Sequence, residues 1–420
     1  MLVAAILLAG NNSLLVYIFP FYKISIVKIT TRFICSARFN YKEAFSKSRF
    51  DFPKAFKMEK IKFEPEPAYG FYATLKIRVH SYFKENRISP YANAEAVSKS
   101  LCFSILFLSC YFIILKVDLP IGLFLIAWFM MGVFLMLAAM SMVHDAAHGV
   151  YSSKRWINQL LLRFANLVGG DGYMYKYKHT ISHHPYTNIP GVDIDLEQSG
   201  IVRVTPFTKS KKQHRFQYNY MKVLYPFFAL FWVLVRDFKY YNRKKIGLVE
   251  AHHAAFHWFF LFFSKIFYLF YMLIVPALVL HISFFQLFSG FLCMHVGSGV
   301  IAMFALLANH VVEDSVFVNP GNDGLIHCSW GEHQLRTTDD YSPDSKVLSY
   351  LFSGLNHHVA HHLFPRYCHV HYPAITKIVR LTAAEFGLRY RYNSLFGALN
   401  SHFKLLKNLG KETKLKQAVG

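Results

Sequence analysis

The sequence LPIGLFLIAWFMMGVFLMLAAMSMVHDAAH occupies residues 119–148 and combines two signals. Its first part, Leu119–Val143, is apolar and carries no formal charge. This run is longer than the ~20 apolar residues that a membrane-spanning helix needs. The second part places His144 and His148 four residues apart, which puts both imidazoles on one face of a helix. We therefore predict a membrane helix that ends in a pair of histidines.

Three further apolar runs accompany this one. They are Leu101–Leu115, Ile266–Leu280 with Trp258–Phe263 ahead of it, and Phe284–Ala308. Short connections separate the first run from the second and the third from the fourth, so the runs pair into two hairpins. The predicted fold class is an all-α integral membrane protein. It has four transmembrane helices in two hairpins and a histidine-rich helical cap on the cytoplasmic side.

The composition agrees with a membrane protein. Hydrophobic residues make up 54% of the 420 residues and charged residues only 17%, against ~45–50% and ~25% in soluble domains. These values exclude a disordered chain and argue against an ordinary soluble enzyme. The formal net charge is +22. Nucleic-acid binding would explain this charge but not the apolar runs, so we interpret it as the Lys/Arg excess of cytoplasmic loops and predict no nucleic-acid partner.

The N-terminal segment differs from the rest. Residues 1–57 are apolar up to Phe21 and then basic, whereas a secretory signal carries its positive charge before the apolar stretch. Two interpretations stay open: an additional membrane-associated segment, or a start codon assigned upstream of a true start at Met58. We expect one domain over residues 58–410 and a basic C-terminal tail over 411–420.

Two shorter segments have membrane-like character without the length of a span. Leu75–Phe83 carries three basic residues among apolar ones and predicts an amphipathic helix. Val223–Val235 is apolar, but its thirteen residues are too few to cross a bilayer. We expect this second segment to lie in the membrane interface or to pack on the domain.

Histidine is the residue type that carries the chemistry. Eight of the 22 histidines fall into three short clusters: His144 and His148; His179, His183 and His184; and His358, His361 and His362. Spacings of three and four direct imidazoles to one helical face. In the second cluster, we expect His179 and His183 to share a face and His184 to lie on the next one. His310 follows the last apolar run as His144 follows the second.

These clusters predict a metal site. An isolated histidine is commonly a satisfied polar residue, but three clusters on one side of the predicted membrane are not explained that way. Eight or nine imidazoles are too many for one zinc ion and suit two metal ions. Imidazole serves zinc, copper, iron and nickel alike. Oxygen chemistry on an apolar substrate would favour iron. The six cysteines form no CxxC pair and predict no zinc finger.

A metal transporter or sensor is the alternative from another functional class. Its ligands would lie inside the spans, near the middle of the membrane. Here the histidine clusters follow the spans, in polar sequence. Stoichiometric zinc without an oxygen-dependent product would favour this alternative.

At the clusters, the sequence resembles the membrane fatty acid desaturase family, and within it bacterial front-end acyl desaturases of the linoleoyl-CoA type. The stretches that carry the resemblance are HDAAHGVY at 144–151, KHTISHHPYTN at 178–188, HQLRTT at 333–338 and GLNHHVAHHLFPRYCHVHYP at 354–373. The resemblance covers residues 58–410. It implies an oxygen-dependent enzyme that introduces a double bond into a fatty acyl chain, held as acyl-CoA or acyl-lipid.

The resemblance also implies a site. The family's two iron ions would be held by His144, His148, His179, His183, His184, His358, His361 and His362, with His310 as an additional ligand. No HPGG haem motif of a fused cytochrome occurs, so electrons would come from a separate ferredoxin or cytochrome with its reductase. Molecular oxygen would be the co-substrate and membrane lipid the surroundings. The expected location is a bacterial inner membrane with the histidine clusters on the cytoplasmic side.

Two departures leave the position of the double bond open. Front-end members often carry Gln where this chain has His358, and an aromatic residue where it has His357. A membrane di-iron hydroxylase of fatty acids, alkanes or carotenoids would use the same clusters, and it remains the alternative within the superfamily. Its product would gain one oxygen instead of losing two hydrogens.

Other residues are candidates for supporting roles. Acids that could accept hydrogen bonds from the metal-binding imidazoles are Asp145, Asp193, Asp195 and Glu313, with solvated loop acids as the alternative interpretation. An acyl groove between the hairpins would be lined by residues such as Trp128, Phe129, Met136 and Phe304, although such residues more often pack or face lipid. The basic face could bind CoA phosphates or an anionic headgroup, or be positive-inside charge alone.

Overall fold

The computed structural model describes residues 4–9, 13–18, 61–197, 200–320 and 323–411. The chain divides into two units, Met1–Lys54 and Ala55–Gly420. In the first unit, strands β1 (Ala4–Ala9) and β2 (Ser13–Ile18) pair antiparallel. Met58 and the tail from residue 412 lie outside the described residues. The interpretations of residues 1–57 and 411–420 therefore stay predictions.

The second unit is mostly helical, and four of its helical segments are long and apolar enough to cross a membrane. They are α3 (Ala94–Lys116), α4 (Ile121–His148), the segment Ala255–Val279 and α12 (Phe284–Leu306). The prediction of four apolar helices is thus confirmed. The first begins earlier than the apolar run because Asn93 caps it, accepting a hydrogen bond from the backbone nitrogen of Ala96 at 3.0 Å.

The third apolar segment is not a uniform α-helix. It consists of α10 (Ala255–Leu269), a π-helical turn (Phe270–Ile274) and α11 (Val275–Val279). Pro276 has no N–H to donate to the carbonyl of Met272. The widened turn lies directly before this proline, where the regular hydrogen-bond ladder is interrupted.

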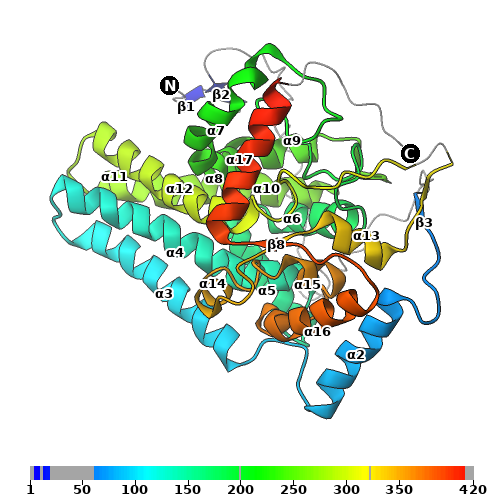
Figure 1. Ribbon diagram of the computed structural model, residues 1–420. Coiled ribbons are helices and arrows are strands. Elements are labelled where there is room, and N and C mark those ends of the chain that lie inside the picture. Colours follow the sequence, from blue (N-terminus) through cyan, green and yellow to red (C-terminus); the bar gives the residue numbers. More distant parts are fainter. Residues whose placement is uncertain (1–3, 10–12, 19–60, 198–199, 321–322, 412–420) are drawn as a thin grey trace, which may run out of the picture. The chain divides into compact units, whose positions relative to one another are not determined.

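Helices α4 and α12 lie in close contact beside α3 (Figure 1). Small residues permit this approach: a Cβ at Gly132 would fall 1.8 Å from the carbonyl oxygen of Met294, and one at Gly297 would fall 2.2 Å from that of Phe129. Ser298 Oγ donates to the carbonyl of Gly132 at 2.8 Å. Such small-residue packing is typical of helices in membranes.

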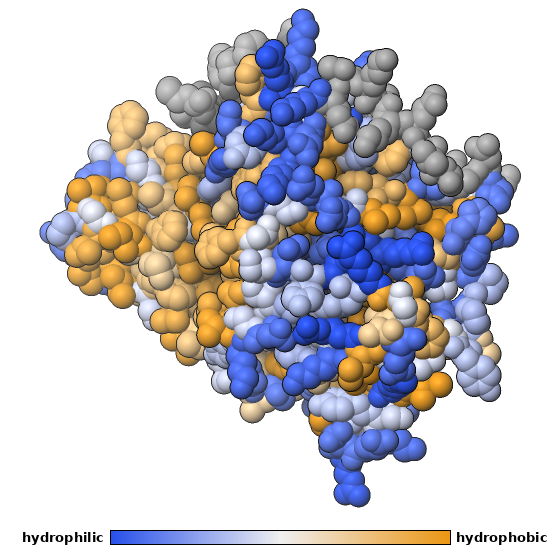
Figure 2. All heavy atoms as spheres, in the orientation of Figure 1, coloured by the Kyte–Doolittle hydropathy of each residue, from blue (hydrophilic) through white to orange (hydrophobic). Residues whose placement is uncertain are grey.

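The surface of these helices is apolar. Figure 2 shows hydrophobic residues gathered over α3, α4, α11 and α12, and hydrophilic residues over α17 (Leu395–Lys411). Leu278 and Phe285 are 77% and 78% exposed, and exposed apolar residues recur along all four segments. Contiguous exposed apolar surface of this extent marks a membrane-embedded region. The chain is a membrane protein; its two-hairpin topology and the side of the clusters stay predictions.

Short helices connect the second and third apolar segments. They are α5 (Arg155–Leu167), α6 (Gly172–Lys178), α7 (Gln217–Leu224), α8 (Phe228–Phe231) and α9 (Asp237–Tyr241). Strands β4 (Lys245–Ile246) and β5 (Val249–Glu250) follow and pair antiparallel. The apolar island 223–235 packs on α12, since a Cβ at Gly299 would fall 1.8 Å from the carbonyl oxygen of Pro226. The alternative, a position in the membrane interface, stays a prediction.

The C-terminal third forms most of the helical cap. Its elements are β6 (Leu325–Ile326), α13 (Trp330–Thr337), β7 (Asp340–Tyr341), α14 (Lys346–Leu351), α15 (His358–Leu363), α16 (Tyr372–Glu385) and β8 (Tyr392–Asn393). Strand β6 pairs parallel with β3 (Lys62–Phe63), and β7 pairs parallel with β8. The predicted amphipathic helix is α2 (Phe71–Glu85), whose buried face packs with α13, α15 and α16 in one core that includes Leu75, Val79 and Val359.

Candidate metal centre

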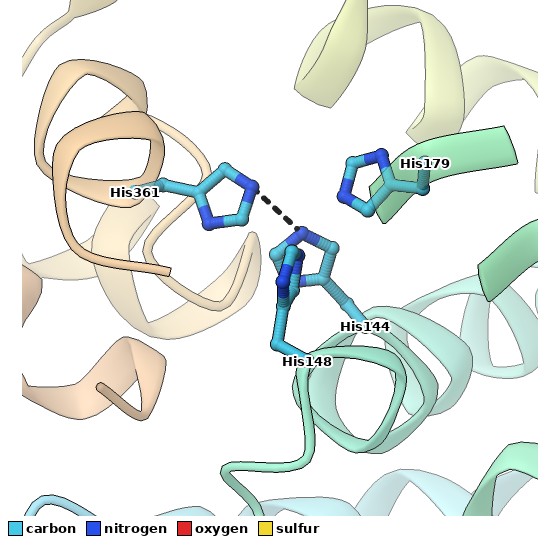
Figure 3. A group of neighbouring side chains, drawn as sticks. All are labelled: His144, His148, His179 and His361. Carbon is cyan, nitrogen blue, oxygen red and sulfur yellow. Dashed lines mark hydrogen bonds between the residues drawn. The ribbon is translucent and has the colours of Figure 1, made fainter. Parts of the chain in front are cut away.

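All nine histidines predicted to bind metal come together, and eight of them sort into two groups of four. The first group is His144, His148, His179 and His361; the second is His183, His310, His358 and His362. Within each group the ring nitrogens that could bind a metal lie within 4.8 Å of one another. His184 forms a further such set with His361 and His362. Each group combines residues from distant parts of the sequence, as the convergence of the first group in Figure 3 shows.

Helix α4 positions the first pair. It continues without a break past the apolar run to His148, so His144 and His148 lie one turn apart. The helix ends because Gly149 adopts φ +75°, a left-handed conformation that favours glycine. Nε2 of His144 lies 3.2 Å from Nε2 of His361, which brings the end of α4 against α15 (Figure 3).

The second cluster does not form the regular α-helix predicted for it. Helix α6 ends at Lys178, and His179–His183 is a π-helical turn in which the backbone nitrogen of His184 donates to the carbonyl of His179 at 3.1 Å. Pro185 follows and has no N–H to continue an α-helix. Nε2 of His179 lies 3.1 Å from Nε2 of His184. His179 and His183 belong to different four-histidine groups, but their rings stack at 5.5 Å and the two also form a smaller set with Asp195.

Helix α15 positions the third cluster. The carboxylate of Asp340 accepts a hydrogen bond from the backbone nitrogen of Val359 at 2.7 Å and fixes the start of this helix. His357, just before it, faces away from the centre: its ring nitrogens lie 2.9 Å from Thr376 Oγ1 and 2.9 Å from Ser349 Oγ. His357 is therefore a satisfied polar residue, whereas His358 belongs to the second group.

Six of the predicted metal-binding histidines have lowered pKa values, which favours the neutral imidazole that metal binding requires. Burial and the neighbouring imidazoles lower the pKa of His179, His184, His358, His361 and His362 well below its usual value. Burial lowers the pKa of His310 to about 3. Only His183 shifts the other way among these: burial lowers its pKa, but the carboxylates of Asp193 and Asp195 together outweigh burial.

Three of the four predicted acids lie beside the histidines. Nδ1 of His183 lies 3.2 Å from both carboxylate oxygens of Asp193 and 3.8 Å from Asp195. Asp145 Oδ1 lies 3.7 Å from Nδ1 of His144. The structure does not bring Glu313 to this site. Among the described residues, its 42%-exposed side chain contacts Lys404 and Asn408 instead.

Other partners of the histidines were not predicted. Oε1 of Gln334 accepts from Nδ1 of His362 at 2.9 Å, and the Gln334 amide donates to the carbonyl of His184 at 3.0 Å. The hydroxyl of Tyr372 lies 3.0 Å from Nδ1 of His361. Both residues fall within the stretches that carry the family resemblance, but neither has a spacing that identifies it as a partner.

Two cavities meet at the centre. One is lined by imidazoles of both groups and by Lys178 and Arg236, whereas the walls of the other are almost wholly apolar and include Leu135 and Val168. Both are lined by His144, Tyr175, Trp232, Leu306 and Leu355. Of the residues expected along an acyl groove, Met136 lines the apolar cavity, whereas Trp128 is buried in the core between α4 and α12.

Orphaned nitrogens show that the site fits a metal. Nε2 of His148, His310 and His362 is buried, and it has no hydrogen-bond partner among the described residues. A buried polar atom without a partner is costly, and a metal ion would satisfy these lone pairs.

Comparison with known proteins gives the relatives of this chain. The family model for fatty acid desaturases matches residues 121–394. The acyl-lipid (8-3)-desaturase of Physcomitrium patens is 34% identical over 367 residues, covering 84% of this chain and 75% of that protein. The sn-1 linoleoyl-lipid 6-desaturase of Synechocystis sp. is 30% identical over 361 residues, covering 84% of this chain and 98% of that protein. The acyl-lipid (8-3)-desaturase of Mortierella alpina is 29% identical, covering 83% and 80%.

Proposed function

Because the chain belongs to the fatty acid desaturase family, we propose that it introduces a double bond into an acyl chain esterified to a membrane lipid, on the carboxyl side of an existing double bond. The observation that carries this proposal is the convergence of nine histidines beside an apolar cavity, eight of them in two groups of four. The relatives' names, acyl-lipid and linoleoyl-lipid desaturase, favour a lipid-bound substrate over acyl-CoA.

The proposed cofactor is a pair of non-haem iron ions. One would be held by His144, His148, His179 and His361, the other by His183, His310, His358 and His362, with His184 between them. Bound iron would supply the redox chemistry by which one oxygen molecule, two external electrons and two protons remove two hydrogens from the chain and leave two water molecules. Neutral imidazole is a suitable ligand for iron.

The protein's own residues would hold the substrate in register. A methylene chain offers no polar handle, so its position depends on the shape of an apolar cavity and on the exclusion of water. His144, Tyr175 and Trp232 line both cavities, which supports a path for the acyl chain past the first group. Asp193, Gln334 and Tyr372 would keep the imidazoles oriented.

Electrons would come from a separate ferredoxin or cytochrome with its reductase, since the chain carries no haem motif of its own. We propose a bacterial inner membrane as the location, with the centre on the cytoplasmic side, because the Lys/Arg-rich segments 144–253 and 309–420 flank the apolar pairs. The family-model match lies within the second unit. This supports residues 58–410 as the desaturase domain, and deletion of residues 1–57 should leave activity unchanged.

The test is product analysis. The protein is expressed with an electron donor and its reductase in a host of defined lipid composition supplied with linoleate, and total fatty acids are derivatised and analysed by gas chromatography–mass spectrometry. A new double bond that is absent with His183→Ala supports the proposal and locates the bond. A product heavier by one oxygen would assign the chain to the hydroxylases instead.

A further inference from the structure

A buried polar chain lies behind His144. Nζ of Lys99, on α3, lies 2.6 Å from Nε2 of His369, and Nδ1 of His369 lies 2.6 Å from Oδ2 of Asp145. All three residues are at most 2% exposed. These three hydrogen-bonded side chains therefore link α3, the segment after α15 and the end of α4.

The hydrogen bonds fix one oxygen of Asp145. Its Oδ2 accepts from Nδ1 of His369, from the backbone nitrogen of His369 at 3.3 Å and from Sγ of Cys368 at 2.9 Å. Lys99 donates to Nε2 of His369, which leaves the ring's only proton on Nδ1, pointing at Asp145. His369 is thereby held in one tautomer.

The other oxygen of Asp145 has one candidate partner. Oδ1 of Asp145 and Nδ1 of His144 are both buried, and neither has a hydrogen-bond partner among the described residues. They lie 3.7 Å apart, beyond hydrogen-bond distance. An Nδ1–H of His144 directed at this oxygen would leave Nε2 as the metal-binding atom, and Nε2 is the atom that faces His361.

A second reading of this cluster is weaker. Asp145, Cys368 and His369 are themselves close enough to share a metal ion. However, the amino group of Lys99 occupies Nε2 of His369, and an ammonium beside the cluster disfavours a further cation. A buried lysine is costly unless it is paired, and here its hydrogen-bond partner is His369.

We propose that Lys99 and His369 are positioning residues for the first metal site: they orient Asp145, which holds His144 in the tautomer that binds iron through Nε2. This inference rests on the proposed function, because it presupposes a metal at the first group. It adds two residues, from elements distant in sequence, that act through Asp145 without touching the metal.

The experiment measures iron rather than turnover. The full-length protein is purified in nanodiscs, stripped of bound metal and titrated anaerobically with ferrous iron. The stoichiometry and affinity of iron binding are compared for wild type, Lys99→Met, Lys99→Arg and His369→Phe. Lys116→Met is the matched control, since Lys116 lies on the same helix and is exposed. Circular dichroism and thermal unfolding report whether each variant folds.

We expect Lys99→Met and His369→Phe to weaken one of the two iron sites by about 10–100-fold while the other keeps its affinity. Lys99→Arg, which retains a donor, should keep most of the affinity of the weakened site, and Lys116→Met should match wild type. Two unchanged sites in folded Lys99→Met would overturn the inference and leave the proposed function intact. A wild type that binds no iron would overturn both, and a third bound metal would favour the rejected reading.

Discussion

The two groups of histidines differ in the hydrogen-bond partners of their Nδ1 atoms. In the second group, Nδ1 has a close partner in three of the four histidines: Asp193 for His183, the backbone carbonyl of Thr337 for His310, and Gln334 for His362. Nδ1 of His358 is buried without a partner among the described residues. In the first group, the partner seen at hydrogen-bond distance on Nδ1 is Tyr372, behind His361. Behind His144 the carboxylate of Asp145 stands 3.7 Å away.

This difference shows which contacts fix the orientation of the imidazoles in each group. The second group is fixed by residues of the cap, including a main-chain carbonyl that no substitution can remove. The first group lies at the end of a membrane helix and depends on side chains for its orientation. We therefore expect single substitutions to affect the two groups separately.

The largest effect should come from His183→Ala, which removes a proposed ligand of the second group. We expect product to fall below detection and bound iron to drop from two toward one per chain, while membrane insertion is unchanged. Iron analysis and fatty acid profiles measure this. His252→Ala is the control, because its side chain is 73% exposed and pairs with Glu250. Full activity in His183→Ala would refute the ligand assignment.

Gln334→Met should have the next largest effect. It removes the acceptor of His362 and the donor to the carbonyl of His184. Loss of such a partner typically costs about 10–100-fold in metal affinity or activity. Gln334→Glu keeps an acceptor for His362 and should lose less. Equal losses in the two variants, measured by iron titration, would show that the hydrogen bond to His362 does not matter.

Tyr372→Phe tests the first group with a smaller change. The hydroxyl at 3.0 Å from His361 contributes one hydrogen bond, and about 1 kcal/mol corresponds to a loss of affinity of roughly fivefold. The loss should fall on the iron site that Lys99→Met also weakens. Tyr392→Phe, at a 51%-exposed tyrosine, is the control. A loss at the other site would contradict the sorting of the histidines into these two groups.

The smallest effect is expected for Glu313→Gln. This acid was a candidate partner of the histidines, yet it pairs with Asn408 and Lys404 at the surface. Activity should stay within about twofold of wild type, as for most surface substitutions. A tenfold loss in product yield would mean that Glu313 acts on the centre in a way the contacts do not explain.

The sequence predicted which residues form this site better than it predicted how they divide into groups. Uncharged apolar length identified the four long helices, histidine spacing identified eight of the residues that converge, and the place of His310 after the last apolar run identified the ninth. The division into two groups was not predictable, because it depends on a π-helical turn that a fourfold spacing does not signal. Gln334 was missed for another reason: it reaches His184 from 150 residues away, and only the tertiary fold sets such a contact.

The π-helical turn has a mechanical consequence. His361 and His362 are neighbours in the chain and belong to different four-histidine groups, while both also lie close to His184; His183 and His184 are likewise neighbours, and His183 belongs to the second group. The spacing of the two groups is thus set by the backbone of two short segments. A change in the backbone of either segment would therefore shift ligands of both groups at once.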